Sequence, residues 1–216
     1  MKILFTTVIS FLIILACLGQ EKTAYCSDKR EINKYIVGFI PSKANNIYGI
    51  AIGPIGSEAI CNKPYTKYSY GLNLQIPGQG FLQALVISNP PFKQVYARYP
   101  TENKINAEDT VLKRVIHNGL MLSIFGTFSD QVNGVSISGW MSMGNIINGV
   151  SVNLLWNLYK RINGLSIGVV NNSIDVKGVQ IGLINKTANL KGFQIGLWNR
   201  NSKRSLPLIN WSFAAK

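Results

Sequence analysis

The stretch that decides the fold is KGVQIGLIN at residues 177–185, and KGFQIGLWN at residues 191–199 repeats it almost letter for letter. Looser copies of the same phrase precede these two, and each copy is led by a glycine that follows an Asn or a Lys. The leading glycines lie at intervals of 15, 15, 15, 14 and 14 residues: Gly119, Gly134, Gly149, Gly164, Gly178 and Gly192. A fixed interval of this size indicates one structural unit that is copied in tandem.

Apolar residues alternate with small or polar residues inside each copy. The first position after the glycine is apolar in every copy: Leu120, Val135, Val150, Leu165, Val179 and Phe193. The third position is apolar as well: Leu122, Ile137, Val152, Ile167, Ile181 and Ile195. A period of two is typical of a strand with one buried face, so we expect these two columns to point inward. Asn171, Asn185 and Asn199 follow seven residues after a glycine, where we expect the strand to end in a turn.

Two all-β architectures accommodate one strand every 14 or 15 residues. In a β-solenoid-like stack each copy is one coil, and equivalent columns lie in register through parallel hydrogen bonding. In an antiparallel up-and-down β-meander or barrel each copy is one strand and a turn. Near-identical columns and copy lengths favour the solenoid, because every coil there has the same surroundings. One copy buries too little to fold alone, so we expect the change Ile181→Asp to disrupt the whole array.

Residues 35–117 contain two looser copies and residues 118–216 contain the regular array. Gly49 and Gly71 lead the looser copies, which we interpret as degenerate outer units separated by an insertion. Residues 106–116 predict one short helix, with acidic residues in its first turn and basic residues near its end. Pro207 predicts an edge or cap strand at the other end of the array.

The first residues have the pattern of an export signal. Lys2 precedes an apolar run that reaches Leu18, so residues 1–19 are expected to be a secretory signal peptide. Residues 14–17 also resemble a lipoprotein box, in which Cys17 would carry the lipid, and an uncleaved anchor is a third interpretation. Residues 20–34 are polar and charged, which predicts a flexible leader. An exported chain would be found in the periplasm, on the outer membrane surface or outside the cell.

Export would place the remaining cysteines, Cys26 and Cys61, in an oxidising compartment. They could form a disulfide or remain unpaired, because spacing alone does not decide between these states. The chain has one His and no Cys-x-x-Cys pair, so we expect no metal and no other cofactor.

The chain is strongly basic, with 22 Lys and Arg against 9 Asp and Glu and a net charge of +13. This balance favours anionic partners, namely envelope glycans or lipid headgroups rather than nucleic acid, or it serves only to keep the repeats soluble. Aromatic and basic residues interleave in two stretches that could bind such a partner, although ordinary exposed strands contain the same mixture. This candidate ligand surface comprises Lys63, Tyr65, Lys67, Tyr68, Tyr70, Phe92, Lys93, Tyr96, Arg98 and Tyr99.

The two quoted copies, followed by residues 206–211, resemble the Gly-apolar-Gln-apolar-Gly-Leu-apolar-Asn repeats of uncharacterised bacterial surface-repeat proteins of the Bacteroidetes type. The resemblance covers about 100 residues and implies an exported bacterial protein without an established activity. It carries over no functional residues.

The sequence contains no motif of a known enzyme class. His117 is the single histidine, no serine motif accompanies it, and neither a carboxylate pair nor a phosphate-binding loop is evident. We therefore expect no catalysis and no catalytic residues. The leading interpretation is an exported structural or adhesive scaffold, the second is an outer-membrane-associated β protein, and the third is a hydrolase that uses His117.

Overall fold

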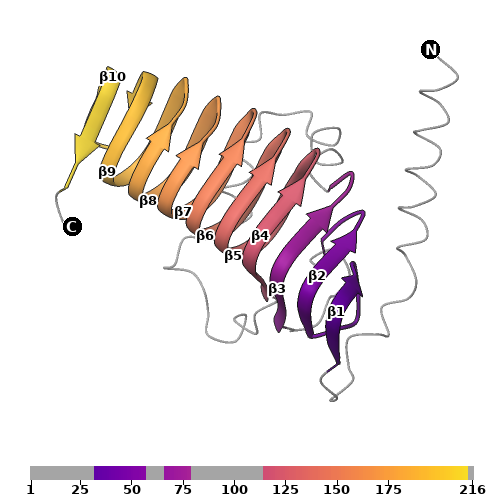
Figure 1. Ribbon diagram of the computed structural model, residues 1–216. Coiled ribbons are helices and arrows are strands. Elements are labelled where there is room, and N and C mark those ends of the chain that lie inside the picture. The colour runs from indigo at the N-terminus through magenta and orange to yellow at the C-terminus, as the bar shows by residue number, and fades with distance from the viewer. Residues whose placement is uncertain (1–31, 57–65, 79–113, 214–216) are drawn as a thin grey trace, which may run out of the picture.

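The computed structural model describes residues 32–56, 66–78 and 114–213, which form ten strands of one sheet in chain order (Figure 1). The strands are β1 (Asn33–Phe39), β2 (Asn46–Gly53), β3 (Thr66–Gln75), β4 (Arg114–Ser123), β5 (Gly126–Ser138), β6 (Met141–Asn153), β7 (Trp156–Ile167), β8 (Val170–Ile181), β9 (Ile184–Arg200) and β10 (Ser205–Ser212).

Strands β1 to β9 pair in parallel, so the chain is a β-solenoid in which each copy is one coil. The leading glycines face one another across neighbouring coils, and Gly49 and Gly71 of the two looser copies belong to the same column. The solenoid prediction is confirmed, and the antiparallel meander is wrong for these nine strands. Only β10 runs antiparallel to its neighbour, β9.

The glycine column is required by the backbone. Gly149 has a φ of +136°, a conformation that residues with a side chain rarely adopt. A Cβ atom at Gly149 would also lie 2.0 Å from the carbonyl oxygen of Gly134 in the preceding coil. The repeated glycine therefore lets successive coils approach closely enough to continue their parallel pairing.

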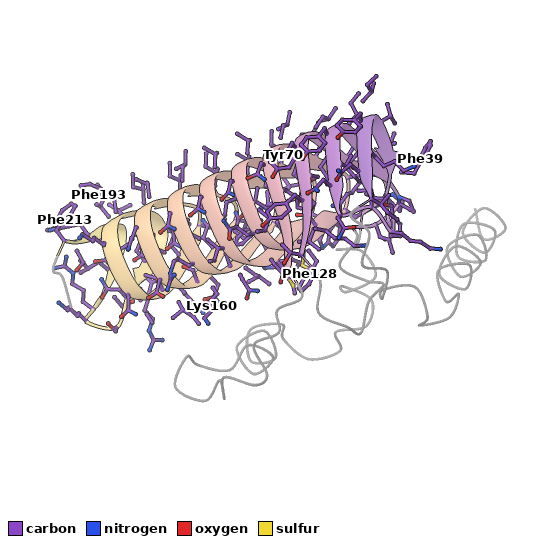
Figure 2. The ribbon with its side chains drawn as sticks, turned by 90° about the horizontal axis from the view of Figure 1, so that it is seen from below. Phe39, Tyr70, Phe128, Lys160, Phe193 and Phe213 are labelled. Atoms are coloured by element: carbon purple, nitrogen blue, oxygen red, sulfur yellow. The ribbon has the colours of Figure 1, made fainter. Side chains whose placement is uncertain are left out.

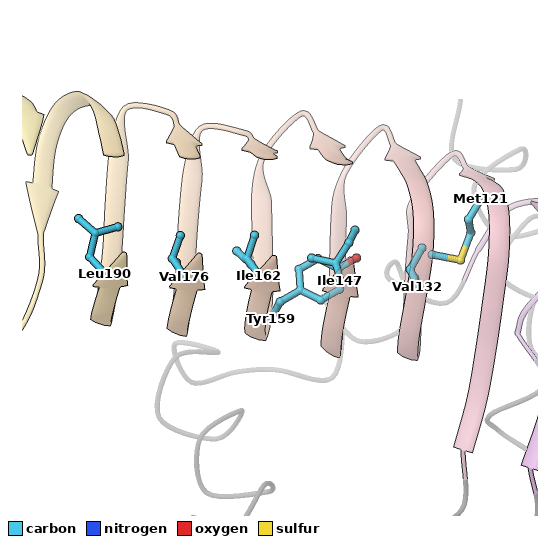
Figure 3. Packing of buried hydrophobic residues seen from close by; sticks show 7 residues of the cluster. All are labelled: Met121, Val132, Ile147, Tyr159, Ile162, Val176 and Leu190. Atoms are coloured by element: carbon cyan, nitrogen blue, oxygen red, sulfur yellow. The ribbon is translucent and has the colours of Figure 1, made fainter. Parts of the chain in front are cut away.

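The apolar part of the interior is the column two residues before each glycine. Val132, Ile147, Ile162, Val176 and Leu190 line up along the axis of the stack (Figure 3). Met121 and Tyr159 complete this cluster. The Tyr159 ring occupies space left by Gly144 in the preceding coil, where a Cβ atom would lie 3.0 Å from Tyr159 Cε1.

The second interior column, two residues after each glycine, is mostly polar. It contains the fully buried side chains of Met121, Ser136, Ser151, Ser166, Gln180 and Gln194. Gln194 Nε2 donates to Gln180 Oε1 at 2.8 Å, and Asn210 Nδ2 of β10 donates to Gln194 Oε1 at 3.0 Å. Gln180 and Gln194 are therefore buried with hydrogen bonds to the neighbouring strand.

The expected direction of the two apolar columns is wrong. The side chains one and three residues after each glycine lie on the outside of the coil, and Ile181 and Ile195 are 37% and 42% exposed. The alternation itself is correct, but the polar set points inward. The expected disruption by Ile181→Asp therefore loses its basis, since Ile181 does not lie between coils.

The expected turns at the asparagines also need correction. Asn171 is the second residue of β8 and Asn185 is the second residue of β9, so each follows a turn and belongs to a strand. Their side chains are buried. Asn171 Nδ2 donates to Asn185 Oδ1, and Asn185 Nδ2 donates to Asn199 Oδ1, both at 2.7 Å. Asn185 Nδ2 also donates to Ile195 O at 3.0 Å. These asparagines therefore form an internal ladder that ties each turn to the next coil.

Two predicted boundaries differ from the structure. β1 begins at Asn33, so two residues assigned to the leader belong to a strand. Residues 114–116 lie in β4, not in the expected helix, and the other residues of that helix lie outside the described ranges. The signal segment 1–19 with Cys17, and also Cys26 and Cys61, lie outside them too.

The strand that contains Pro207 is β10, the last strand of the sheet. β10 lies at the edge of the sheet and its pairing with β9 is irregular between Leu206 and Leu208, on either side of Pro207. Within the described ranges, no helix is long and apolar enough to cross a membrane.

Candidate binding face

The most distinctive surface of the molecule is formed by the two outward apolar columns, which we call the apolar face. Every one of the ten strands contributes one residue to each column. The first column contains Val37, Ile50, Leu72, Leu120, Val135, Val150, Leu165, Val179, Phe193 and Trp211. The second contains Phe39, Ile52, Leu74, Leu122, Ile137, Val152, Ile167, Ile181, Ile195 and Ile209.

The antiparallel strand β10 extends this face and does not interrupt it. Ile209 pairs with Ile195 and Trp211 pairs with Phe193, so β10 places apolar side chains in both columns. Phe213 then packs edge-on against Phe193, with ring centroids 5.1 Å apart. In Figure 2, Phe39, Tyr70, Phe193 and Phe213 lie along one side of the stack, and Phe128 and Lys160 lie along the other.

The face is long and narrow. Ten strands about 4.8 Å apart give it a length of roughly 43 Å. Residues of both columns remain substantially exposed along the stack, including Val37 and Phe193 of the first column and Ile137 of the second. A continuous apolar surface of this kind on a protein usually marks a site of interaction with another molecule.

One border of the face is the column directly before the glycines, and its chemistry changes along the stack. At the N-terminal end the rings of Tyr35, Tyr48 and Tyr70 stack, with centroids 5.3 and 5.0 Å apart. In β4 to β7 this column contains asparagines that donate from coil to coil at 2.7 to 2.8 Å: Asn118, Asn133, Asn148 and Asn163. In β8 and β9 it contains the exposed lysines Lys177 and Lys191.

The residues that follow the two columns along the chain, in the turns and in the strand segments next to them, are also apolar. The exposed ones are Ile124, Trp140, Leu154, Val169, Leu183, Ile184, Leu197 and Trp198. Trp140 precedes β6 and Trp156 begins β7, and their rings contact each other edge to face, with centroids 6.5 Å apart. The apolar surface is therefore wider than its two columns.

Basic groups are concentrated at the C-terminal end of the solenoid. Residues 115–159 contain no Lys and no Arg. The residues that follow contain Lys160, Arg161, Lys177, Lys186, Lys191, Arg200, Lys203 and Arg204. The face is thus neutral in the middle of the stack and bordered by cations at its end.

The carboxylates within the described ranges are Asp130 and Asp175. Asp130 Oδ2 accepts from Val115 N at 2.9 Å, and Asp175 Oδ1 accepts from Asn189 Nδ2 at 2.7 Å. Asp175 also lies 3.8 Å from Arg161. Within the described ranges, neither carboxylate is paired in this way with Lys177 or Lys191.

The structure describes only part of the predicted ligand surface. Lys67 is buried and its Nζ donates to the carbonyl oxygen of Ser42, so it does not belong to an exposed surface. Tyr68 is half-buried and packs on Tyr70, which is exposed and belongs to the tyrosine stack beside the apolar face. The other predicted members lie outside the described ranges: Lys63, Tyr65, Phe92, Lys93, Tyr96, Arg98 and Tyr99.

His117 is buried between coils within a polar cluster. Its Nδ1 atom lies 2.9 Å from Asn73 Nδ2 and within hydrogen-bond distance of Ser69 Oγ. An amide nitrogen can only donate, so His117 Nδ1 acts as an acceptor toward Asn73. Gln75 Nε2 continues the cluster by donating to Asn73 Oδ1 at 3.2 Å. In the described part of the chain, no group of three or more His, Cys, Asp or Glu side chains could hold a metal ion.

Sequence reasoning identified the residues of the apolar face but assigned them to the interior. The available signal was the position of the amides, because Gln180 and Gln194 repeat at one position and the buried asparagines at another. Stacked copies let such side chains bond to their own equivalents, which makes a polar column stable inside. No family model, curated protein or solved structure matches this chain.

Proposed function

We propose that this protein is an exported, non-catalytic scaffold of a bacterial envelope that binds its partner through the apolar face. The observation that carries the proposal is the apolar character of both outward columns in all ten strands. These apolar side chains pack against their equivalents in neighbouring strands but leave part of their surface open to solvent, so their presence in every strand supports a role in binding.

The solenoid suits such a role because its surface repeats. Each coil presents the same two apolar positions about 4.8 Å beyond the last, so contacts with an extended partner add up along the stack. Hydrogen-bonded ladders inside hold neighbouring coils in register, as between Asn171, Asn185 and Asn199. A stiff surface loses little conformational freedom on binding.

The features of the sequence agree with an envelope location. The export pattern of residues 1–19 and the resemblance to bacterial surface-repeat proteins both support it. The buried position of His117, among Ser69 and Asn73, is that of a side chain that joins coils and supports a structural role for it.

The proposal is tested by making the apolar face polar. A triple variant, Ile167→Thr, Ile181→Thr and Ile195→Thr, keeps β-branched residues in three successive strands. We expect its circular dichroism and Tm to match those of the wild type, while the protein moves from the envelope fraction of expressing bacteria to the soluble fraction.

The matched control changes one residue in each of the same three strands, on the other side of the coils: Lys160→Thr, Ile174→Thr and Ala188→Thr. We expect this control to remain with the envelope. The proposal is wrong if both triple variants distribute between the fractions as the wild type does, or if both are released equally.

A further inference from the structure

The C-terminal end of the apolar face combines features that do not occur together elsewhere on it. We call this end the C-terminal patch and define it as Lys177, Ile181, Leu183, Lys191, Phe193, Ile195, Leu197 and Trp198. Its apolar members are 37% to 63% exposed. We propose that this patch lies against the surface of an anionic lipid bilayer, an inference that rests on the function proposed above.

The lysines are placed to reach headgroups while the apolar side chains enter the bilayer. Lys191 lies two residues before Phe193, which puts their Cα atoms roughly 7 Å apart along the strand. Tyr70 occupies the same column as Lys191, and Figure 2 shows Tyr70 on the same side of the stack as Phe193. Long lysine side chains can keep their ammonium groups at the polar surface while the neighbouring apolar groups are buried.

Tryptophans add a second feature of membrane surfaces. Trp198 belongs to the patch and is 51% exposed, and Trp211 continues the first column of the face on β10. The guanidinium of Arg204 lies 4.6 Å from the centroid of the Trp211 ring. Tryptophan combines an apolar ring with a polar N–H group and is enriched where a bilayer meets water.

Charge favours a bilayer over a second copy of the chain as the occupant. The chain carries a net charge of +13, and within the described ranges neither Lys177 nor Lys191 of the patch forms an ion pair with a carboxylate. Two copies that met through this face would bring these cations together. A bilayer of anionic lipids attracts each of them, with a gain of about tenfold in affinity for one or two well-placed lysines.

The experiment uses the purified full chain and vesicles of phosphatidylcholine, with or without phosphatidylglycerol. We expect sedimentation with the anionic vesicles and a blue shift of tryptophan fluorescence, and much weaker binding to the neutral vesicles. Reversal of both patch charges, Lys177→Glu with Lys191→Glu, is expected to weaken anionic binding at least about tenfold.

The matched control reverses two exposed or half-exposed charges outside the patch, Lys34→Glu with Lys160→Glu, and changes the net charge equally. We expect it to keep affinity within about threefold of the wild type. Every variant retains the same N-terminal residues, so differences among them report on the patch. A change Ile181→Thr with Ile195→Thr is expected to remove the fluorescence shift.

The bilayer proposal is overturned if the wild type does not bind anionic vesicles or binds neutral vesicles equally well. It is also overturned if the patch variant and its control lose the same affinity for anionic vesicles. The broader scaffold proposal is judged separately. If the wild type does not bind the anionic vesicles but the triple threonine variant still leaves the envelope fraction, the apolar face binds another partner. A dimer detected by light scattering would identify that partner as a second copy of the chain.

Discussion

The solenoid buries polar side chains and exposes apolar ones in the second half of most strands, whereas an ordinary half-buried sheet does the reverse. In residues 174–181 of β8 the buried side chains are Val176 and Gln180, whereas Val179 and Ile181 lie on the outer surface. The buried glutamine is satisfied because its equivalent in β9 donates to it at 2.8 Å. The comparison shows that tandem stacking can bury amides as readily as hydrocarbons, which leaves apolar residues available for the exterior.

The sharpest way to break this comparison is to place a charge on each side of one strand. Val176 is fully buried, so Val176→Asp would place a carboxylate among hydrocarbons and should lower the free energy of unfolding by about 4 kcal/mol or more. Ile181→Asp adds the same group on the outer surface and should cost less than about 1 kcal/mol. Urea denaturation of both variants measures the difference, and equal losses would contradict the assignment of inside and outside.

The second test is a substitution in the glycine column, which should lower the free energy of unfolding by about 3 kcal/mol. Gly178 has a φ of +139°, and a Cβ atom there would lie 1.9 Å from the carbonyl oxygen of Gly164. Gly178→Ala should therefore strain the backbone and separate β7 from β8, with a large fall in Tm. The adjacent exposed change Lys177→Ala is the control and should leave Tm nearly unchanged. A stable Gly178→Ala variant would show that the close approach of these coils is not required.

The two asparagine ladders allow the inside and the outside to be compared with one residue type. Asn185→Ala removes buried hydrogen bonds to Asn199 and to Ile195 O and should cost about 2 to 3 kcal/mol. Asn148 is half-buried in the outer ladder, where water can replace its bonds to Asn133 and Asn163. Asn148→Ala should cost about 1 kcal/mol or less, as measured by thermal unfolding. A larger loss at Asn148 would reverse the proposed order.

The smallest expected effect concerns Tyr159. Burial raises the pKa of its phenol above the usual value of 10.0, and the hydroxyls of Ser136, Ser151, Ser142 and Thr127 oppose this rise. These hydroxyls lie near the Tyr159 oxygen, but none of the described residues forms a hydrogen bond of ordinary geometry with it. Tyr159→Phe should therefore be neutral or stabilising by up to about 1 kcal/mol at pH 7.

The same change should alter the response to alkaline pH. Above about pH 10 the unfolded chain loses the Tyr159 proton while the folded chain retains it, so folding becomes less favourable as pH rises. This loss should be absent from Tyr159→Phe, and the Tm difference between the two proteins should widen above pH 10. A constant difference across that range would show that the phenol titrates equally in both states.

Much of the fold could be predicted from the sequence because repetition determines it. The spacing of Gly119 to Gly192 indicated one unit per coil, and the equality of the copies favoured the parallel stack over a meander. The looser copies at Gly49 and Gly71 and the edge strand at Pro207 were also predictable, because glycine permits a backbone conformation that other residues rarely adopt and proline cannot donate to a further strand.

The candidate site could be predicted only in part. Tyr70 is exposed, whereas Lys67 is buried, because its Nζ donates to the carbonyl oxygen of Ser42, 25 residues away. Side chains of the apolar face were recognised as a set and assigned to the wrong side. Alternation defines two faces of a strand without identifying which one is covered.

The sequence by itself determined the period, the strand alternation and the glycine column of this protein, since each follows from local backbone geometry. Only the tertiary structure decided which alternating set became the interior. That choice depends on whether amides such as Asn171 and Asn185 meet their equivalents in the next coil, and hydrogen bonds between stacked copies exist only once the coils have stacked.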